Sequence, residues 1–175
     1  MTQGIHEKMT AALKVRDGLF TSPLEHVELV ASGNGWPLVR TGESEAQLVI
    51  EASGLGLQLT VSWNEDSESL FVACMFDLKI PAARQAETTR LVQMINERML
   101  MGHFDYWRTE GLALYRNGLL LSGGARATAA QCESLIHLAV EACERYYPAF
   151  QFVIWAGKSA EEALQACLFE TAGNA

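Results

Sequence analysis

The sequence predicts a single α+β domain in which five strands pack against helices. Two neighbouring segments alternate between apolar and polar residues with a period of two, as half-buried strands do, and only Ser53-Gly54 separates them. Other segments carry apolar residues at helical spacing. The predicted order along the chain is helix, three strands, helix, two strands, helices, which is typical of an α+β domain.

Residues 1–20 are the least regular part of the chain. Ile5, Met9 and Leu13 are spaced as a short apolar stripe, but a glycine follows and no cap is evident. Two interpretations stay open for this arm, a flexible segment and a helix. No internal repeat, linker or low-complexity segment divides the rest, so residues 21–175 are expected to form one domain.

The first half of the domain is predicted to form one helix and three strands. The helix begins at Ser22-Pro23, with the serine as N-cap and the proline in the first turn, and ends at Gly33–Gly35. Strands are expected over Glu45–Ala52 and Leu55–Trp63. The next strand, Leu70–Leu78, is apolar on both faces, which indicates burial on both sides, either under another layer or against a second subunit.

A helix and a β-hairpin are predicted to follow. Pro81 opens a helix over Ala82–Met101, because apolar residues there recur at helical spacing, and Gly102 ends it. Strands are then expected over His103–Arg108 and Leu112–Leu121. The three residues between them make a turn of hairpin length.

Two capping boxes mark helices in the C-terminal part of the chain. Thr128 and Gln131 are spaced as the first box, and a long apolar stripe at helical spacing follows them. Pro148 is expected to break or kink that helix, because proline has no backbone amide hydrogen to donate. Ser159 and Glu162 are spaced as the second box, at the start of a final helix.

Composition and charge argue against several classes of partner. The net charge of −8 at pH 7 disfavours binding to nucleic acid through its phosphates and adhesion to anionic membranes. The longest apolar run, Leu70–Phe76, is far shorter than the roughly 20 residues that a membrane-spanning helix needs. Lys8, Lys14 and Arg16 lie where an export signal would be apolar, so a cytoplasmic location is expected.

The cysteines are expected to be reduced thiols that pack as small apolar residues. Cys132 and Cys143 are eleven residues apart on one expected helix, hence roughly 16 Å apart, which is too far for a disulfide. Together with Cys74 and Cys167, they show neither a Cys-x-x-Cys pair nor a Cys/His cluster with zinc spacing. No metal or other cofactor is therefore predicted.

No catalytic residue is predicted either, because no set of nucleophile, base and orienting group is evident. His103 and Asp105 share one strand face with Trp107 and could share a proton or a metal ion. Two ligands do not make a site, so a solvent-exposed or interface face is the favoured interpretation. The residues predicted for a protein-binding or dimer interface are Phe71, Ala73, Met75, His103, Asp105 and Trp107.

A second candidate site precedes the helix that starts near Thr128. Gly123, Gly124 and Arg126 connect a strand to this helix, and backbone amides at a helix N-terminus can hold an anion. The segment matches neither the dinucleotide-binding nor the phosphate-loop motif. The alternative interpretation is a glycine turn between strand and cap.

Five blocks in the segment Asp77–Gly173 carry a family resemblance. They are Asp77–Pro81 (DLKIP), Ile95–Arg98 (INER), Gly102–Trp107 (GHFDYW), Ala142–Phe152 (ACERYYPAFQF) and Trp155–Ser159 (WAGKS). With these ordered blocks the chain resembles the YbjN family of bacterial proteins, which is described as a regulator of sensory transduction. The resemblance implies a fold like that of type III secretion chaperones, a twisted antiparallel five-stranded sheet on helices in the order α-β-β-β-α-β-β-α, usually as a homodimer. It supplies no catalytic residues.

The function expected from these observations is a non-enzymatic, chaperone-like or regulatory module that binds protein. Its expected partners are a second copy of the chain and a protein segment, with no role for nucleic acid or membranes. The alternative is a sensor of a small ligand or anion at the Gly123-Gly124 loop. An enzyme is the least favoured class, because the sequence shows no catalytic set.

Overall fold

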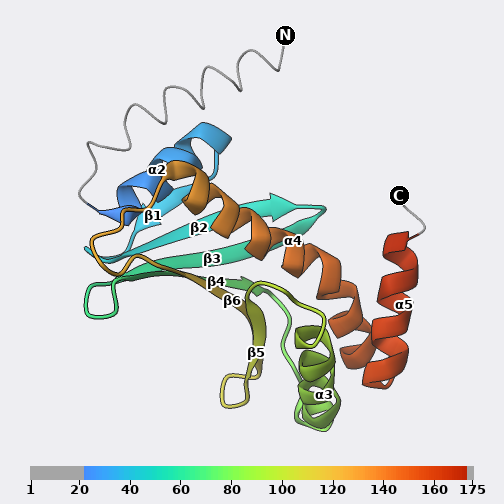
Figure 1. Cartoon of the computed structure of the whole chain (residues 1–175). Coiled ribbons are helices and arrows are strands. Elements are labelled where there is room, and N and C mark those ends of the chain that lie inside the picture. The colour runs from blue at the N-terminus through green and yellow to red at the C-terminus, as the bar shows by residue number, and fades with distance from the viewer. Residues whose placement is uncertain (1–21, 173–175) are drawn as a thin grey trace.

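One antiparallel sheet forms the centre of the fold, and helices cover one of its faces (Figure 1). The structure is a computed structural model that describes residues 22–172, so the expectations for residues 1–20 lie outside the described residues. The elements in chain order are α2 (Pro23–Asn34), β1 (Leu38–Arg40), β2 (Glu45–Ala52), β3 (Leu55–Asn64), β4 (Ser69–Phe76), the 3₁₀ turn η1 (Ala82–Arg84), α3 (Gln85–Asn96), β5 (His103–Trp107), β6 (Leu112–Leu120), α4 (Ala129–Ile154) and α5 (Ala160–Ala172).

The sheet has six strands in the order β1-β2-β3-β4-β6-β5, and every neighbouring pair is antiparallel. The predicted α+β class is therefore confirmed, but the predicted number of five strands is wrong. The additional strand is β1, which pairs with β2 and places Leu38 opposite Leu48. Three residues are too few to show an alternating pattern, so periodicity could not reveal this strand.

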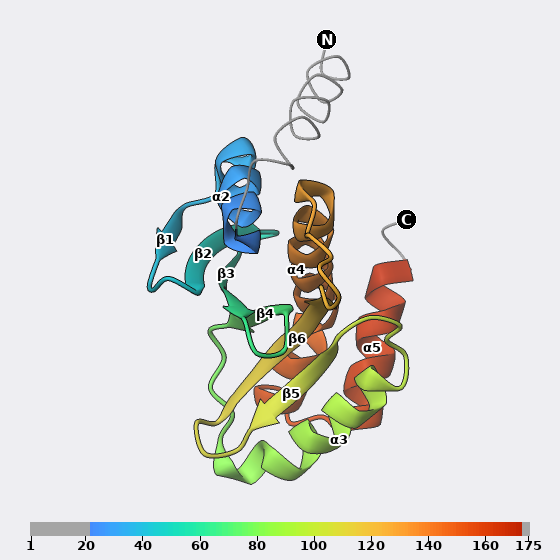
Figure 2. The same ribbon diagram turned by 60° about the vertical axis from the view of Figure 1, so that its left-hand side comes forward.

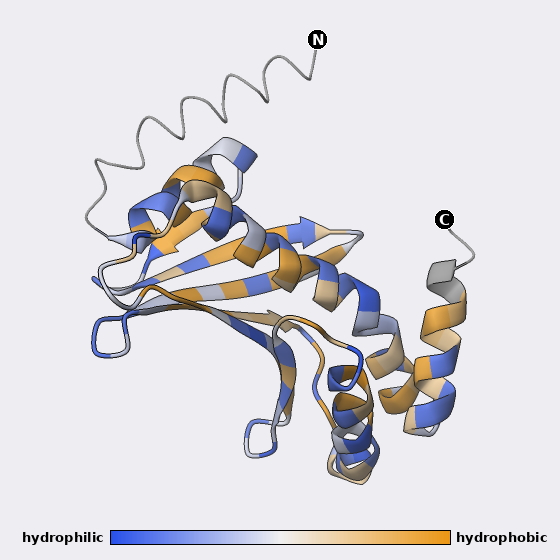
Figure 3. Ribbon diagram, viewed as in Figure 1, coloured by the Kyte–Doolittle hydropathy of each residue, from blue (hydrophilic) through white to orange (hydrophobic). Residues whose placement is uncertain are grey.

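The core lies between the sheet and the helices α2 and α4. Apolar and polar residues alternate along β2 and β3 (Figure 3), and Leu48 and Leu59 are opposite each other and buried on the helix side. Rings of Phe76, Phe104 and Phe150 meet with centroids 5.3 to 6.5 Å apart, which joins β4, β5 and α4. Figure 2 shows α3 and α5 beside the C-terminal half of α4, where they close this end of the core.

The helix predicted over Ala82–Met101 is shorter than expected, because α3 ends at Asn96. The side chain of Asn96 donates to the carbonyl of Phe104 at 2.9 Å and accepts from the amide of Phe104 at 2.8 Å. These two bonds tie the end of α3 to β5. Gly102 then leads into β5 with a φ of +68°, and a Cβ at this position would collide with the ring of Tyr115.

The helix α4 continues through Pro148, so the expected break at that residue is wrong. Proline inside a helix costs about 3 kcal/mol. Tyr146, Ala149 and Phe150 flank Pro148 and are buried, so packing against the core offsets this cost. Although α4 has 26 residues, neither it nor any other described helix combines the length and apolarity needed to cross a bilayer.

Both predicted capping boxes are confirmed. Thr128 Oγ1 accepts from the Gln131 amide at 3.2 Å, and Gln131 Oε1 accepts from the Thr128 amide at 2.9 Å. Glu162 Oε2 accepts from the Ser159 amide at 3.0 Å, and Ser159 Oγ accepts from the Glu162 amide at 3.4 Å. These bonds satisfy backbone groups that the first turn of a helix leaves without helical partners.

Candidate functional site

The candidate site is the face of the sheet opposite α2 and α4, termed the open face. Side chains alternate across a sheet, so every second residue of each strand belongs to this face. At its β4–β6–β5 end the residues on this face are Ser69, Phe71, Ala73 and Met75 on β4, Leu112, Leu114, Arg116, Gly118 and Leu120 on β6, and His103, Asp105 and Trp107 on β5. The structure thus places all six residues of the predicted interface on one surface.

The strand β6 joins the two groups of predicted residues. One group lies on β4 and the other on β5, and β6 pairs with both strands. Arg116 of β6 is opposite Ala73 on one side and opposite His103 on the other. Sequence reasoning missed Arg116, because only the strand order shows that β6 lies between β4 and β5.

Large apolar side chains are exposed on the open face. Phe71, Trp107 and Leu120 are 40%, 44% and 74% exposed, and Val39 and Val49 add to the face at its β1–β2 end. Gatherings of exposed apolar side chains are typical of surfaces that contact other molecules. Sequence reasoning missed Leu120 and the two valines. Counting alternate residues along the predicted strand 112–121 would have placed Leu120 on the same face as Arg116.

A glycine on β6 leaves room for the ring of Phe71. Phe71 is opposite Gly118 in the register, and a Cβ added at Gly118 would lie 3.0 Å from Phe71 Cδ1. A side chain at position 118 would therefore push the ring outward. The shape of this part of the open face depends on that contact.

The β5–β6 end of the open face carries an ion pair. Arg116 Nη1 lies 2.8 Å from Asp105 Oδ2, and His103 Nε2 lies 3.9 Å from the same oxygen. The guanidinium of Arg116 therefore pairs with the carboxylate of Asp105. Sequence reasoning considered His103 and Asp105 together and did not predict this pair. Among residues 22–172, no group of three or more His, Cys, Asp or Glu side chains gathers as metal ligands.

The carboxylate of Glu68, in the turn before β4, accepts a hydrogen bond from the Gly123-Gly124 loop. The amide of Gly123 donates to Glu68 Oε2 at 3.2 Å. Both glycines have φ near +80°, and Arg126 is exposed. An anion at Gly123 would have to displace or sit beside the negative charge of Glu68, so the geometry does not favour the predicted anion site.

The cysteines lie in the core. All four are free thiols and buried. A hydrogen bond with the side chain of Cys74, and then burial, raise the pKa of Cys143 far above its ordinary range. Burial likewise raises the pKa of Tyr115, whose hydroxyl donates to the carbonyl of Met101 at 3.2 Å. These shifts follow from packing in the core and lie away from the open face.

The fold and the open face together define the structural class of this protein. It is an α+β protein whose antiparallel sheet has helices on one face and a partly apolar, exposed surface on the other. The chain matches the model of the YbjN family, described as "Putative bacterial sensory transduction regulator", over residues 23–152. Because this match spans well over half of the 175 residues, the chain belongs to the YbjN family.

A solved structure shares the fold. The crystal structure of "YbjN, a putative transcription regulator from E. coli" superimposes with a TM-score of 0.51 and 11% sequence identity. The alignment covers 84% of this chain and 93% of that chain. No curated protein matches the sequence. At this identity the likeness establishes the fold alone.

Proposed function

We propose that this protein is a regulatory module that acts by binding other protein chains and not by catalysis, with the open face as its contact surface. The observation that carries the proposal is the exposure of Phe71, Trp107 and Leu120 on one side of the sheet. Exposed apolar surface is unfavourable in water, and contact with a partner removes it from water. The family description as a regulator of sensory transduction supports the regulatory role.

The first occupant of the open face is a second copy of the chain. The strand β4 is apolar on both faces, and only one of them lies on the side of α2 and α4. The chain carries a net charge of −8, but at the β5–β6 end of the open face Arg116 neutralises Asp105. A second copy therefore meets little like-charge repulsion at this end of the surface.

The resemblance to the YbjN family implies a fold like that of type III secretion chaperones, usually a homodimer, and this expectation supports the same arrangement. In this proposal the homodimer lies in the cytoplasm and acts on a protein partner. It needs neither a metal nor another cofactor, and it contacts neither nucleic acid nor a membrane.

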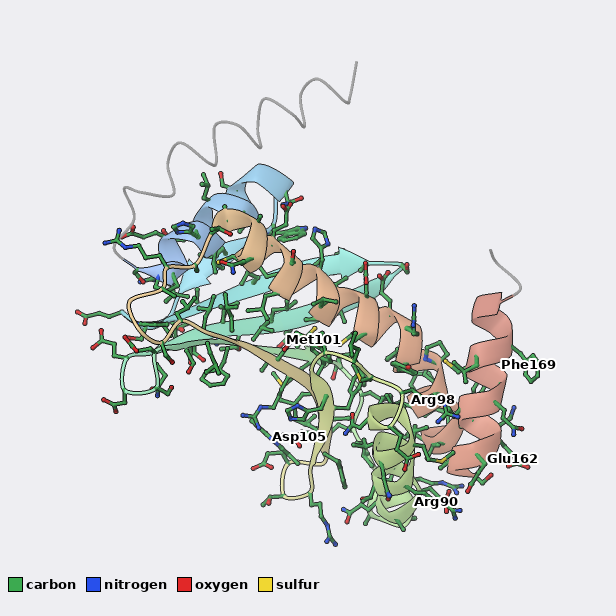
Figure 4. All side chains as sticks on the ribbon, viewed as in Figure 1. Arg90, Arg98, Met101, Asp105, Glu162 and Phe169 are labelled. Atoms are coloured by element: carbon green, nitrogen blue, oxygen red, sulfur yellow. The ribbon has the colours of Figure 1, made fainter. Side chains whose placement is uncertain are left out.

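Light scattering at micromolar concentration and neutral pH tests the proposal. We expect a mass of about 38 kDa, twice the 19.2 kDa of one chain. Leu120→Asp should shift this mass toward that of one chain, because Leu120 is 74% exposed on the open face. Phe169→Asp is the matched control, since Phe169 is 77% exposed on α5 (Figure 4) and should leave the mass unchanged. A wild-type mass of about 19 kDa would contradict the proposal.

A further inference from the structure

The edge of the sheet is incomplete beside β6. The strand β5 pairs with Leu112–Arg116 of β6, whereas β4 pairs with β6 as far as Leu120. Residues 117–120 therefore have a strand neighbour on one side only. An unpaired edge of this kind is a template on which another extended segment can add by backbone hydrogen bonds.

An apolar hollow lies next to this free edge, on the helix side of the sheet. Its volume is about 290 Å³. It runs between the free edge and the first half of α4, and its lining includes Met101, Leu119, Ser134, Leu135 and Leu138. This hollow and the free edge 117–120 are together termed the edge groove. Side chains of a segment added to the edge would alternate into the hollow and out of it.

Asn117 is a buried polar residue of the edge groove, only 9% exposed. Its Oδ1 accepts from the amide of Gly118 at 2.8 Å, and its side chain also bonds with the hydroxyl of Tyr115. These bonds hold the side chain beside the free edge. The backbone groups of residues 117–120 that lack a strand neighbour on the β5 side would supply the hydrogen bonds for an added segment.

A second hollow, of about 300 Å³, continues from the first and shares Met101 and Leu138 with it. Arg98 and Arg145 line it together with Glu141. Figure 4 shows Arg98 and Met101 on the loop that follows α3, beside α4. Two guanidiniums against one carboxylate give this end of the groove a positive balance, although the chain as a whole carries −8. A carboxylate on the bound segment is therefore favoured here.

We infer that the edge groove binds an extended segment of a partner protein, with apolar side chains at alternate positions and a carboxylate at the end near Arg98 and Arg145. The segment adds to β6 at residues 117–120 as a short antiparallel or parallel strand. Its backbone groups pair with those of residues 117–120 that have no strand neighbour on the β5 side. This inference extends the proposed protein-binding function to a second surface, on the opposite side of the sheet from the open face.

Selection from a phage library of random peptides of about ten residues, which span roughly 33 Å when extended, tests the inference on the full-length protein. We expect the selected peptides to carry alternating apolar residues and an acidic residue. Ser134→Trp should weaken their binding by about tenfold or more, because Ser134 is exposed and a large ring there fills the hollow. Gln93→Trp, on an exposed position of α3, should leave binding unchanged.

Two further measurements separate this inference from its alternatives. Arg145→Glu should weaken binding of the acidic peptides and not of variants in which the acid is replaced by its amide. Amide hydrogen exchange at Gly118 should slow when a selected peptide is bound.

Three results would each overturn the inference. They are a selection that yields no peptide, peptide binding that Ser134→Trp does not weaken, and unchanged hydrogen exchange at Gly118 when peptide is bound. If Ser134→Trp instead halves the solution mass, a second copy occupies the groove and the inference is wrong. Trp107→Asp, which changes the open face outside residues 117–120, should shift the solution mass toward that of one chain and leave peptide binding intact, so the two proposals fail separately.

Discussion

Arg116 and Asp105 form an ion pair across the β5–β6 hairpin, with Nη1 2.8 Å from Oδ2. The two side chains stay 46% and 36% exposed. Ion pairs that remain in contact with water contribute between zero and about 1 kcal/mol to stability. The pair therefore sets the charge pattern of the open face and contributes little to folding.

The first prediction follows from this exposure. In a chain kept monomeric by Leu120→Asp, Arg116→Ala should lower the free energy of unfolding by less than about 1 kcal/mol, because solvent screens the pair there. Urea denaturation at a fixed protein concentration measures this value, and Asp105→Asn serves as the matched variant from the other partner. A loss of about 3 kcal/mol or more in that monomeric background would show that the pair is buried within the single chain and would contradict the prediction.

The second prediction concerns the junction of α3 and β5. Asn96→Ala removes the two hydrogen bonds to the backbone of Phe104, each worth about 1 kcal/mol net, so we expect a loss of about 2 kcal/mol. Gln93→Ala, an exposed change on the same helix, should alter the free energy of unfolding by less than about 0.5 kcal/mol. Equal effects of the two substitutions in urea denaturation would contradict the proposed role of Asn96.

The third prediction concerns the thiols. The side chain of Cys74 and burial raise the pKa of Cys143, so its reactive thiolate form is rare. Cys74, Cys132 and Cys167 are buried as well. A thiol reagent should therefore react slowly with the native protein and rapidly with all four cysteines in denaturant. Rapid labelling of several cysteines in the native protein, or a disulfide found by mass spectrometry, would contradict the buried, reduced state.

The fourth prediction concerns the start of α5. The amide of Ser159, and then its hydroxyl, lower the pKa of Glu162 below its ordinary value of 4.5. Because the folded pKa is the lower one, the contribution of this cap is fully present above pH 4.5 and is lost as the pH falls through the folded pKa. Ser159→Ala removes the hydroxyl and should raise the pKa of Glu162 part of the way. Carboxyl titration by NMR measures both values, and a wild-type pKa at or above 4.5 would contradict the capping account.

Local patterns predicted most of the fold. The alternation in β2 and β3 and the two capping boxes each depend on a few neighbouring residues, and each is confirmed. The errors arose where distant contacts decide the outcome. The strand β1 depends on pairing with β2, α3 ends where Asn96 bonds to Phe104, and α4 passes Pro148 because its flanks are buried.

The candidate site was likewise predicted only where it depends on residues that are neighbours in the sequence. Sequence periodicity placed His103, Asp105 and Trp107 on one strand face, and the apolar pattern of the strand 70–78 indicated a second surface. Only the strand order showed that β6 lies between them and contributes Arg116. The free edge of β6 was not predictable, because it results from the unequal lengths of two paired strands.

Photo-crosslinking at two exposed positions tests the central claim, that the open face is a contact surface, most directly. A benzophenone amino acid replaces Leu120 on the open face in one variant and Phe169 on α5 in the other. On irradiation of the purified protein, we predict a covalent dimer of about 38 kDa, twice the mass of one chain, from position 120 and none from position 169. Crosslinking from position 169 alone, or from neither position, would contradict the account.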